Sequence, residues 1–143
     1  MSHVILNRQR KVKVAIATFE KFLAKAFEAI GEADRRSATI VFVSDEKMRI
    51  LNLSFRKKNA TTDVLSFPFE DDGFGGGDEP SLGDIVISVE QAARQAKSNR
   101  MKLDRELKQL MLHGLLHLCG YDHETDNGEM NRRELRLREE LGI

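Results

Sequence analysis

The segment LDRELKQLMLHGLLHLCGYDH, residues 103–123, organises the sequence around one long helix. Apolar residues recur every three or four positions, which predicts a largely buried helix from Leu103 to Leu118. Gly120 follows and can adopt the left-handed backbone that ends a helix sharply. His113 and His117 are four residues apart, so both imidazoles lie on one helical face about one turn from each other.

Three of the four histidines in the chain fall within this segment. Isolated histidines are usually solvated or hydrogen-bonded in a core, but here the turn at Gly120 returns His123 toward His113 and His117. Three protein nitrogens with one open position are typical of catalytic zinc, whereas structural zinc sites usually have four protein ligands. The segment therefore predicts one zinc ion at the end of the long helix, although the same donors also suit nickel, copper or manganese.

The histidine spacing matches the zinc-peptidase pattern H-E-x-x-H-x-x-G-x-x-H with one departure. Gly114 stands where those peptidases have the glutamate that acts as general base. A glycine inside a helix costs about 1 kcal/mol relative to alanine, so Gly114 indicates a close approach by backbone or substrate. Peptide hydrolysis is therefore only the second interpretation of this pattern.

Two further residues, Cys119 and His3, have side chains that can bind metals but are not predicted to be ligands. Cys119 lies two residues beyond His117, about 200° around a continuing helix, and is expected to pack in the core. His3 is far away in sequence and is expected to be solvated.

The rest of the chain predicts strands and helices that do not alternate strictly. Short apolar or β-branched stretches predict strands at Val4–Leu6, Thr39–Val43, Val64–Phe69 and Gly83–Ser88. Periodic apolar residues and capping residues predict four helices besides the one above: Lys11–Ile30, Ser44–Phe55, Ser88 to about Ser98, and one beginning near Asp126. Pro68 favours an edge or an end for its strand. This order predicts an α+β fold: one domain over residues 1–143, with a small mixed sheet of about four strands packed with about five helices.

Length and composition agree with a single globular domain. The chain has 143 residues, 23 basic and 23 acidic side chains, and one cysteine. A net charge of zero argues against attachment to DNA or membrane through overall charge, although a local patch remains compatible with it. The single cysteine, with no secretory signal and no apolar run of about 20 residues, predicts a cytoplasmic protein.

Residues 70–80 contain five acidic residues and four glycines. A glycine-rich loop can hold phosphate, but this one lacks the P-loop lysine and its carboxylates would repel phosphate. We expect it to be a connection between two strands.

Three motifs together resemble those of the YbeY endoribonuclease family. The first is HGLLHLCGYDH at 113–123, with glycine in place of the peptidase glutamate. The second is LNLSFR at 51–56 followed by TDVLSFP at 62–68, and the third is LGDIVIS at 82–88. The resemblance extends from about residue 40 to the end of the chain, and the chain length also fits.

The resemblance implies a metal-dependent endoribonuclease that cleaves single-stranded RNA. It further implies roles in maturation of the 3′ end of small-subunit ribosomal RNA and in ribosome quality control. Zinc on His113, His117 and His123, and a functional arginine at Arg56, are implied in the same way. The family fold, a small mixed sheet with several helices, agrees with the class predicted from the chain.

The chemistry of RNA cleavage is compatible with these residues. It requires an activated nucleophile and positive charge beside the phosphate, and zinc can supply both. Arg56 can add a bidentate grip on phosphate oxygens, although without the resemblance it would be regarded as a solvated charge. Asp122, Asp63 and Glu124 are candidates for a general base or for orienting a metal ligand, and none is singled out.

RNA also requires a basic path. Residues 94–108 carry six basic and two acidic side chains, and a second basic cluster lies at residues 8–13. A solvated helix face explains either cluster equally well. Aromatic residues are only 6% of the chain, so a broad base-stacking surface is not expected, but Tyr121 could stack on one base.

Two other classes of function remain compatible with the sequence. One is a zinc hydrolase of peptides or small molecules. The other is a non-catalytic ribosome-assembly factor in which the metal only stabilises the fold. The expected partners are single-stranded RNA, ribosomal RNA and the ribosome, and neither DNA nor a membrane.

Overall fold

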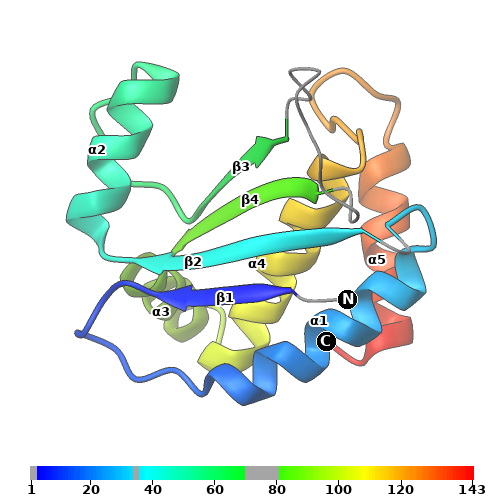
Figure 1. Ribbon diagram of the computed structural model, residues 1–143, viewed down its shortest axis with the longest axis horizontal. Coiled ribbons are helices and arrows are strands. Elements are labelled where there is room, and N and C mark those ends of the chain that lie inside the picture. Colours follow the sequence, from blue (N-terminus) through cyan, green and yellow to red (C-terminus); the bar gives the residue numbers. More distant parts are fainter. Residues whose placement is uncertain (1–2, 34–35, 70–80) are drawn as a thin grey trace.

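The structure, a computed structural model, describes residues 3–33, 36–69 and 81–143. Within these residues, four strands form one sheet and five helices accompany it (Figure 1). The strands are β1 (Val4–Asn7), β2 (Ser37–Val43), β3 (Val64–Pro68) and β4 (Ser81–Ser88). The helices are α1 (Ile16–Ile30), α2 (Asp45–Arg56), α3 (Val89–Ser98), α4 (Leu103–Leu118) and α5 (Glu129–Leu141).

The sheet is mixed, with the strand order β1-β2-β4-β3. β1 pairs with β2 and β2 pairs with β4 in parallel, whereas β3 runs antiparallel to β4. β3 is therefore an edge strand, in which the missing N–H of Pro68 costs no hydrogen bond of the sheet. The predicted α+β class and four-stranded mixed sheet are confirmed.

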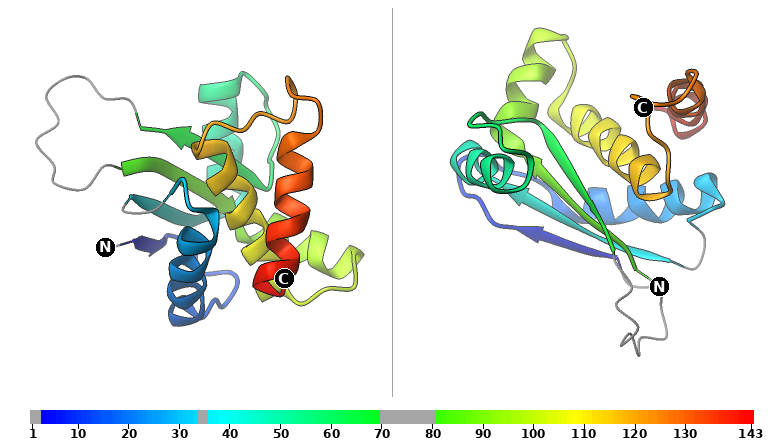
Figure 2. Two further views of the ribbon diagram at one scale, coloured as in Figure 1. Left: turned by 90° about the vertical axis from the view of Figure 1, so that its right-hand side faces the viewer. Right: turned by 90° about the horizontal axis from the view of Figure 1, so that it is seen from above.

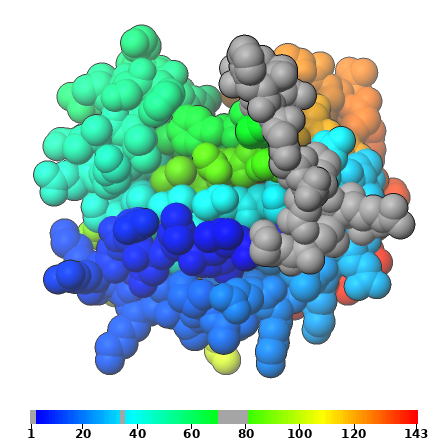
Figure 3. Space-filling model, in the orientation of Figure 1, coloured from blue at the N-terminus to red at the C-terminus, as the bar shows by residue number. Residues whose placement is uncertain are grey.

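The two faces of the sheet are covered differently. Helices α1, α4 and α5 lie on one face (Figure 2), and the strand residues Ile85 and Ile87 belong to the main core on that side. Val86 points to the other face, where it packs in a smaller cluster with Met48 of α2. Because side chains alternate along a strand, the central strand β4 supplies both clusters. The face of the sheet beside α2 is visible in Figure 3.

Helix α4 packs closely on β4 at Gly114. A Cβ atom at this position would lie 2.9 Å from Cγ2 of Ile85, which is tighter than real contacts. A close approach does occur at this glycine, but it is made by a core side chain of β4 and not by backbone or substrate, as was expected.

Two helices begin later than predicted. α1 begins at Ile16 rather than Lys11, because the Gln9 side chain accepts from the Val12 N–H (3.0 Å) and donates to its carbonyl (2.7 Å). α5 begins at Glu129, because the Asp126 carboxylate accepts from the backbone N–H groups of Gly128 and Met130. Other predicted elements lie within a few residues of the observed ones.

We expected His3 to be solvated, but it is partly buried. Its ring stacks on Phe27 with a centroid separation of 4.0 Å, so it covers part of the core beside β1. The acidic, glycine-rich segment 70–80 lies outside the described residues. None of the described helices is long and apolar enough to cross a membrane.

Candidate metal centre

Helix α4 and the turn after it bring three imidazoles together. The helix ends at Leu118, and Gly120 has φ 101°, a backbone conformation that favours glycine. The chain then reverses, so the metal-binding nitrogens of His113, His117 and His123 all lie within 4.8 Å of one another. His113 and His117 are half-buried, whereas His123 is exposed on the turn.

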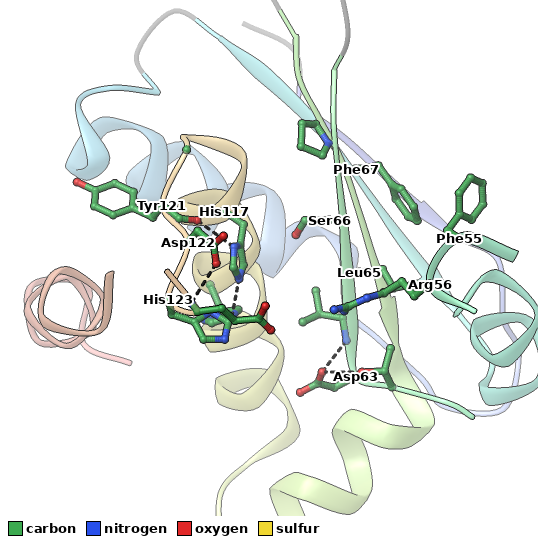
Figure 4. A pocket seen from close by; sticks show the side chains of 16 residues that line it. Phe55, Arg56, Asp63, Leu65, Ser66, Phe67, His117, Tyr121, Asp122 and His123 are labelled. Atoms are coloured by element: carbon green, nitrogen blue, oxygen red, sulfur yellow. Dashed lines mark hydrogen bonds between the residues drawn. The ribbon is translucent and has the colours of Figure 1, made fainter. Parts of the chain in front are cut away.

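The two helical imidazoles are oriented by groups that only accept hydrogen bonds. Nδ1 of His113 donates to Oε1 of Glu134 at 2.5 Å, and Nδ1 of His117 donates to the Tyr121 carbonyl at 3.0 Å. Each Nδ1 therefore carries a proton, and the two Nε2 atoms face each other at 3.1 Å, with lone pairs directed at one another when both rings are neutral. Figure 4 shows His117 and His123 at this site. Two lone pairs at this distance repel unless a positive charge is shared between them.

A metal ion fits this donor set better than a shared proton. Two nitrogens bound to a tetrahedral zinc ion at about 2.0–2.1 Å stand about 3.3 Å apart, close to the observed separation. His123 supplies a third nitrogen, which a shared proton would not need. Burial, together with His113, lowers the pKa of His117 and so favours the neutral imidazole that binds metals.

Glu134 was not identified from the sequence, although it completes the site. It lies on α5 with only 6% of its surface exposed, and its second oxygen accepts from Arg138 at 2.5 Å. Burial would raise the pKa of Glu134, but the hydrogen bond from His113 and the charge of Arg138 keep it below its usual value. In the sequence, Glu134 lies in the apolar stripe of the last helix, between Met130 and Leu137, and this position could have indicated that it is buried.

The turn after α4 is held in place by residues just after the end of α1 and on α5. The Tyr121 hydroxyl donates to Glu32 at 3.2 Å and accepts from Arg133. Its ring points away from the histidines (Figure 4), so Tyr121 is not placed to stack on a base bound beside them. Cys119 is partly buried against the main core, as expected, and burial raises the pKa of its thiol.

The histidines open into a cavity of about 710 Å³ that follows the edge strand β3. Its walls come from the end of α2, residues 62–68, the end of α4 and the following turn. All of the candidate residues from the sequence line it: Arg56, Asp63, His113, His117, Asp122, His123 and Glu124. The Arg56 side chain extends from the last turn of α2 into this cavity (Figure 4).

The three candidate carboxylates have different surroundings. Asp63 precedes β3 and accepts from the Val64 N–H at 2.7 Å and from the Gln95 amide at 3.2 Å. Asp122 accepts from the Glu124 N–H at 3.0 Å and begins the turn that carries His123. Glu124 itself is exposed at the rim.

The two basic clusters do not line this cavity. Arg94 forms an ion pair with Asp45 at 2.7 Å, Lys11 is 3.7 Å from Glu90, and Lys108 lies over the Phe22 ring. These cations have local structural partners, which favours the interpretation as solvated helix faces. The cavity lining instead contains Arg56, at the end of α2.

Comparison with known proteins identifies the family of this chain. The family model described as Endoribonuclease YbeY matches residues 4–142. The chain belongs to this family. The Endoribonuclease YbeY of Alkaliphilus metalliredigens is 42% identical, with 100% of this chain and 97% of the relative covered. That of Aquifex aeolicus is 40% identical, with 92% and 85% covered.

The fold has a solved counterpart as well. The solution structure of a protein from Thermotoga maritima superposes with a TM-score of 0.67 at 26% identity, covering 98% of this chain and 89% of that one. The resemblance to the YbeY family is confirmed, and the match begins at residue 4 and not at about residue 40 as the motifs suggested. As a member of this family, the protein has RNA as its expected class of substrate, and its three histidines are suited to hold a metal ion.

Proposed function

We propose that this protein is a zinc-dependent endoribonuclease that cleaves single-stranded RNA. The proposal is carried by the two imidazoles whose Nε2 atoms face each other at 3.1 Å, with a third imidazole beside them in a cavity that also contains Arg56. Family membership supports RNA as the substrate. Zinc is preferred because imidazole suits it and three nitrogens leave one coordination position open.

His113, His117 and His123 would hold the ion. When bound, zinc would activate a water molecule or polarise a phosphate oxygen. Glu134 and the Tyr121 carbonyl accept hydrogen bonds from Nδ1 of His113 and His117, so that each ring directs its Nε2 toward the position of the ion. The ion site is thereby preorganised by the protein.

Arg56 would bind the scissile phosphate. Its guanidinium can donate two parallel hydrogen bonds to phosphate oxygens and offset the negative charge that develops during cleavage. Asp122 and Glu124 lie nearest in sequence to His123 and remain the candidate bases, since both Asp63 oxygens already accept hydrogen bonds.

The proposed cellular substrate is ribosomal RNA. The family resemblance supports a cytoplasmic role in maturation of the 3′ end of small-subunit ribosomal RNA and in ribosome quality control. Ribosomes and ribosomal RNA are then the expected partners, whereas DNA and membranes are not.

The test is cleavage of a labelled single-stranded RNA by the purified full-length protein. We expect cleavage that a chelator stops and zinc restores, with none of the matched DNA strand cut. His113→Ala should lose both cleavage and stoichiometric metal. Arg56→Ala should retain the metal but lose about 100-fold or more in kcat.

Other outcomes would identify the competing functions. Cleavage of peptides but not RNA would indicate a zinc hydrolase of another substrate. A folded, metal-loaded protein that cuts neither would indicate an assembly factor. Full RNase activity in Arg56→Ala with metal still bound would contradict the phosphate-binding role of Arg56.

A further inference from the structure

Phe55 is the most exposed of the large apolar side chains in the described residues, with 64% of its surface accessible. Other phenylalanines, such as Phe19, Phe27 and Phe42, are fully buried in the core. A single exposed apolar residue is ordinary. The position of Phe55 is not, because it precedes Arg56 and lines the same cavity as the three histidines.

The Phe55 ring is held in a defined orientation. It packs against Phe67 of β3 in an edge-to-face arrangement, with centroids 5.0 Å apart and planes at 66° (Figure 4). β3 is the edge strand along which the cavity lies. One side of the Phe55 ring is thus supported by the protein, and much of the ring remains accessible.

The end of α2 fixes Phe55 and Arg56 relative to each other. Lys57 adopts a left-handed backbone (φ 59°), and its N–H donates to the Leu53 carbonyl at 3.1 Å. The buried Asn52 then donates to the Ala60 carbonyl at 2.8 Å, which holds the following loop against the helix. An aromatic ring and a guanidinium are therefore presented by consecutive residues on a capped helix end.

This combination has the chemistry of single-stranded nucleic-acid recognition. Three consecutive cations, Arg56, Lys57 and Lys58, follow Phe55 directly in the sequence, and Arg56 lines the cavity with it. Sites of this kind combine cations along the phosphate backbone with aromatic rings on which unpaired bases stack. A base within a duplex already stacks on its neighbours and cannot offer its face to the ring.

We propose that Phe55 is the stacking platform for one unpaired base of the RNA strand whose phosphate Arg56 binds. This inference rests on the proposed function and adds the group that would select single strands. It also replaces Tyr121, whose ring points away from the histidines, as the stacking residue.

Binding measurements on the full-length protein test this role. A chelator is present so that no strand is cut, and a fluorescent single-stranded oligoribonucleotide is titrated at fixed salt. We expect Phe55→Ala to weaken binding about 5- to 100-fold, and Phe55→Trp to bind at least as tightly as the natural protein. An oligonucleotide of the same length with abasic residues should bind both forms equally.

The matched control is Leu53→Ala. Leu53 is also exposed on α2, at 47%, but does not line the cavity, so its substitution should leave RNA binding unchanged. An equal loss in Leu53→Ala would show a general effect on α2 and overturn the proposal. Equal losses of single-stranded and duplex RNA in Phe55→Ala would also overturn it.

A second variant covers the case in which alanine destabilises α2. Phe55→Leu keeps an apolar contact with Phe67 but removes the aromatic face, and circular dichroism reports whether it is folded. Natural affinity in folded Phe55→Leu would contradict stacking. The proposed function is tested separately. It is wrong if the natural protein with zinc cuts no single-stranded RNA, and this can happen even when the affinity of the protein for RNA still depends on Phe55.

Discussion

At the scale of a single residue, Glu134 is a buried charge that its neighbours stabilise and that orients a candidate metal ligand. A carboxylate with 6% exposure would be costly alone, but His113 and Arg138 each give it a hydrogen bond at 2.5 Å. The same contact fixes the orientation of the His113 ring. Its stabilising and metal-orienting roles therefore coincide in one side chain.

Glu134→Gln is expected to weaken zinc affinity about 10- to 100-fold, because the amide is a poorer acceptor for the His113 N–H. Competition with a chromophoric chelator measures this affinity. Glu139→Gln changes an exposed carboxylate of the same helix and serves as the control. If the two variants bind zinc equally, Glu134 does not orient the site.

Gly114→Ala is expected to lower the free energy of unfolding by about 1–2 kcal/mol in urea denaturation. Alanine improves helix propensity by about 1 kcal/mol, but the added methyl would meet the β-branched Ile85 at 2.9 Å. The Ile85→Val background removes only Cδ1, which would lie 3.0 Å from the added methyl, and should therefore reduce the loss in part. A more stable Gly114→Ala protein would show that α4 shifts freely on the sheet.

At the scale of elements, a polar network fixes the first turn of helix α2. Asp45 accepts from Ser88 at 2.7 Å, from Thr61 at 3.2 Å and from Arg94 at 2.7 Å. Ser88 also caps α3, so this network joins α2 to the end of β4 and the start of α3. Burial would raise the pKa of Asp45, but Arg94 and Ser88 hold it below its ordinary value of 3.8.

This lowered pKa predicts how stability depends on pH. The unfolded state takes up a proton at Asp45 before the folded state does, so its contribution is complete above about pH 3.8 and is lost as pH falls through the folded pKa. Urea unfolding from pH 7 to pH 2.5 should show Asp45→Asn less stable at neutral pH, with the difference shrinking in acid.

Glu46→Gln is the control for this prediction, because Glu46 is exposed in the same first turn of α2. Its stability curve should parallel that of the natural protein. A difference between Asp45→Asn and the natural protein that stays constant to pH 2.5 would contradict the lowered pKa.

At the scale of the whole molecule, features that depend on neighbouring residues could be predicted from the sequence, whereas contacts between distant elements could not. The caps at Ser44 and Ser88, and the turn at Gly120, depend on neighbouring residues and were identified from the sequence. Glu134 approaches His113 only because α5 packs beside α4. Its place in the apolar stripe of α5 indicates burial, but the identity of its partner on α4 has no signature in either helix alone. The same reason explains the unexpected stacking of His3 on Phe27.

Metal binding should stabilise the entire fold, because the site joins α4 to the turn before α5. At a free zinc concentration of about 1,000 times Kd, the expected gain is about 4 kcal/mol, or roughly 10 °C in Tm. Circular dichroism melts with zinc and with a chelator measure the gain, and His117→Ala should abolish it. An unchanged Tm at saturating zinc in the natural protein would contradict the three-histidine site.

The cavity is formed by two parts of the molecule that are anchored to very different degrees. Only Met48 and Asn52 of α2 are buried, whereas most of α4 is embedded in the main core. Elements with little buried surface open with small free energies, so amide hydrogens of α2 should exchange well before those of α4. Such an opening would carry away Phe55 and Arg56 and leave the histidines in place. Affinity for RNA and affinity for metal would then depend on two separate local stabilities within one small protein.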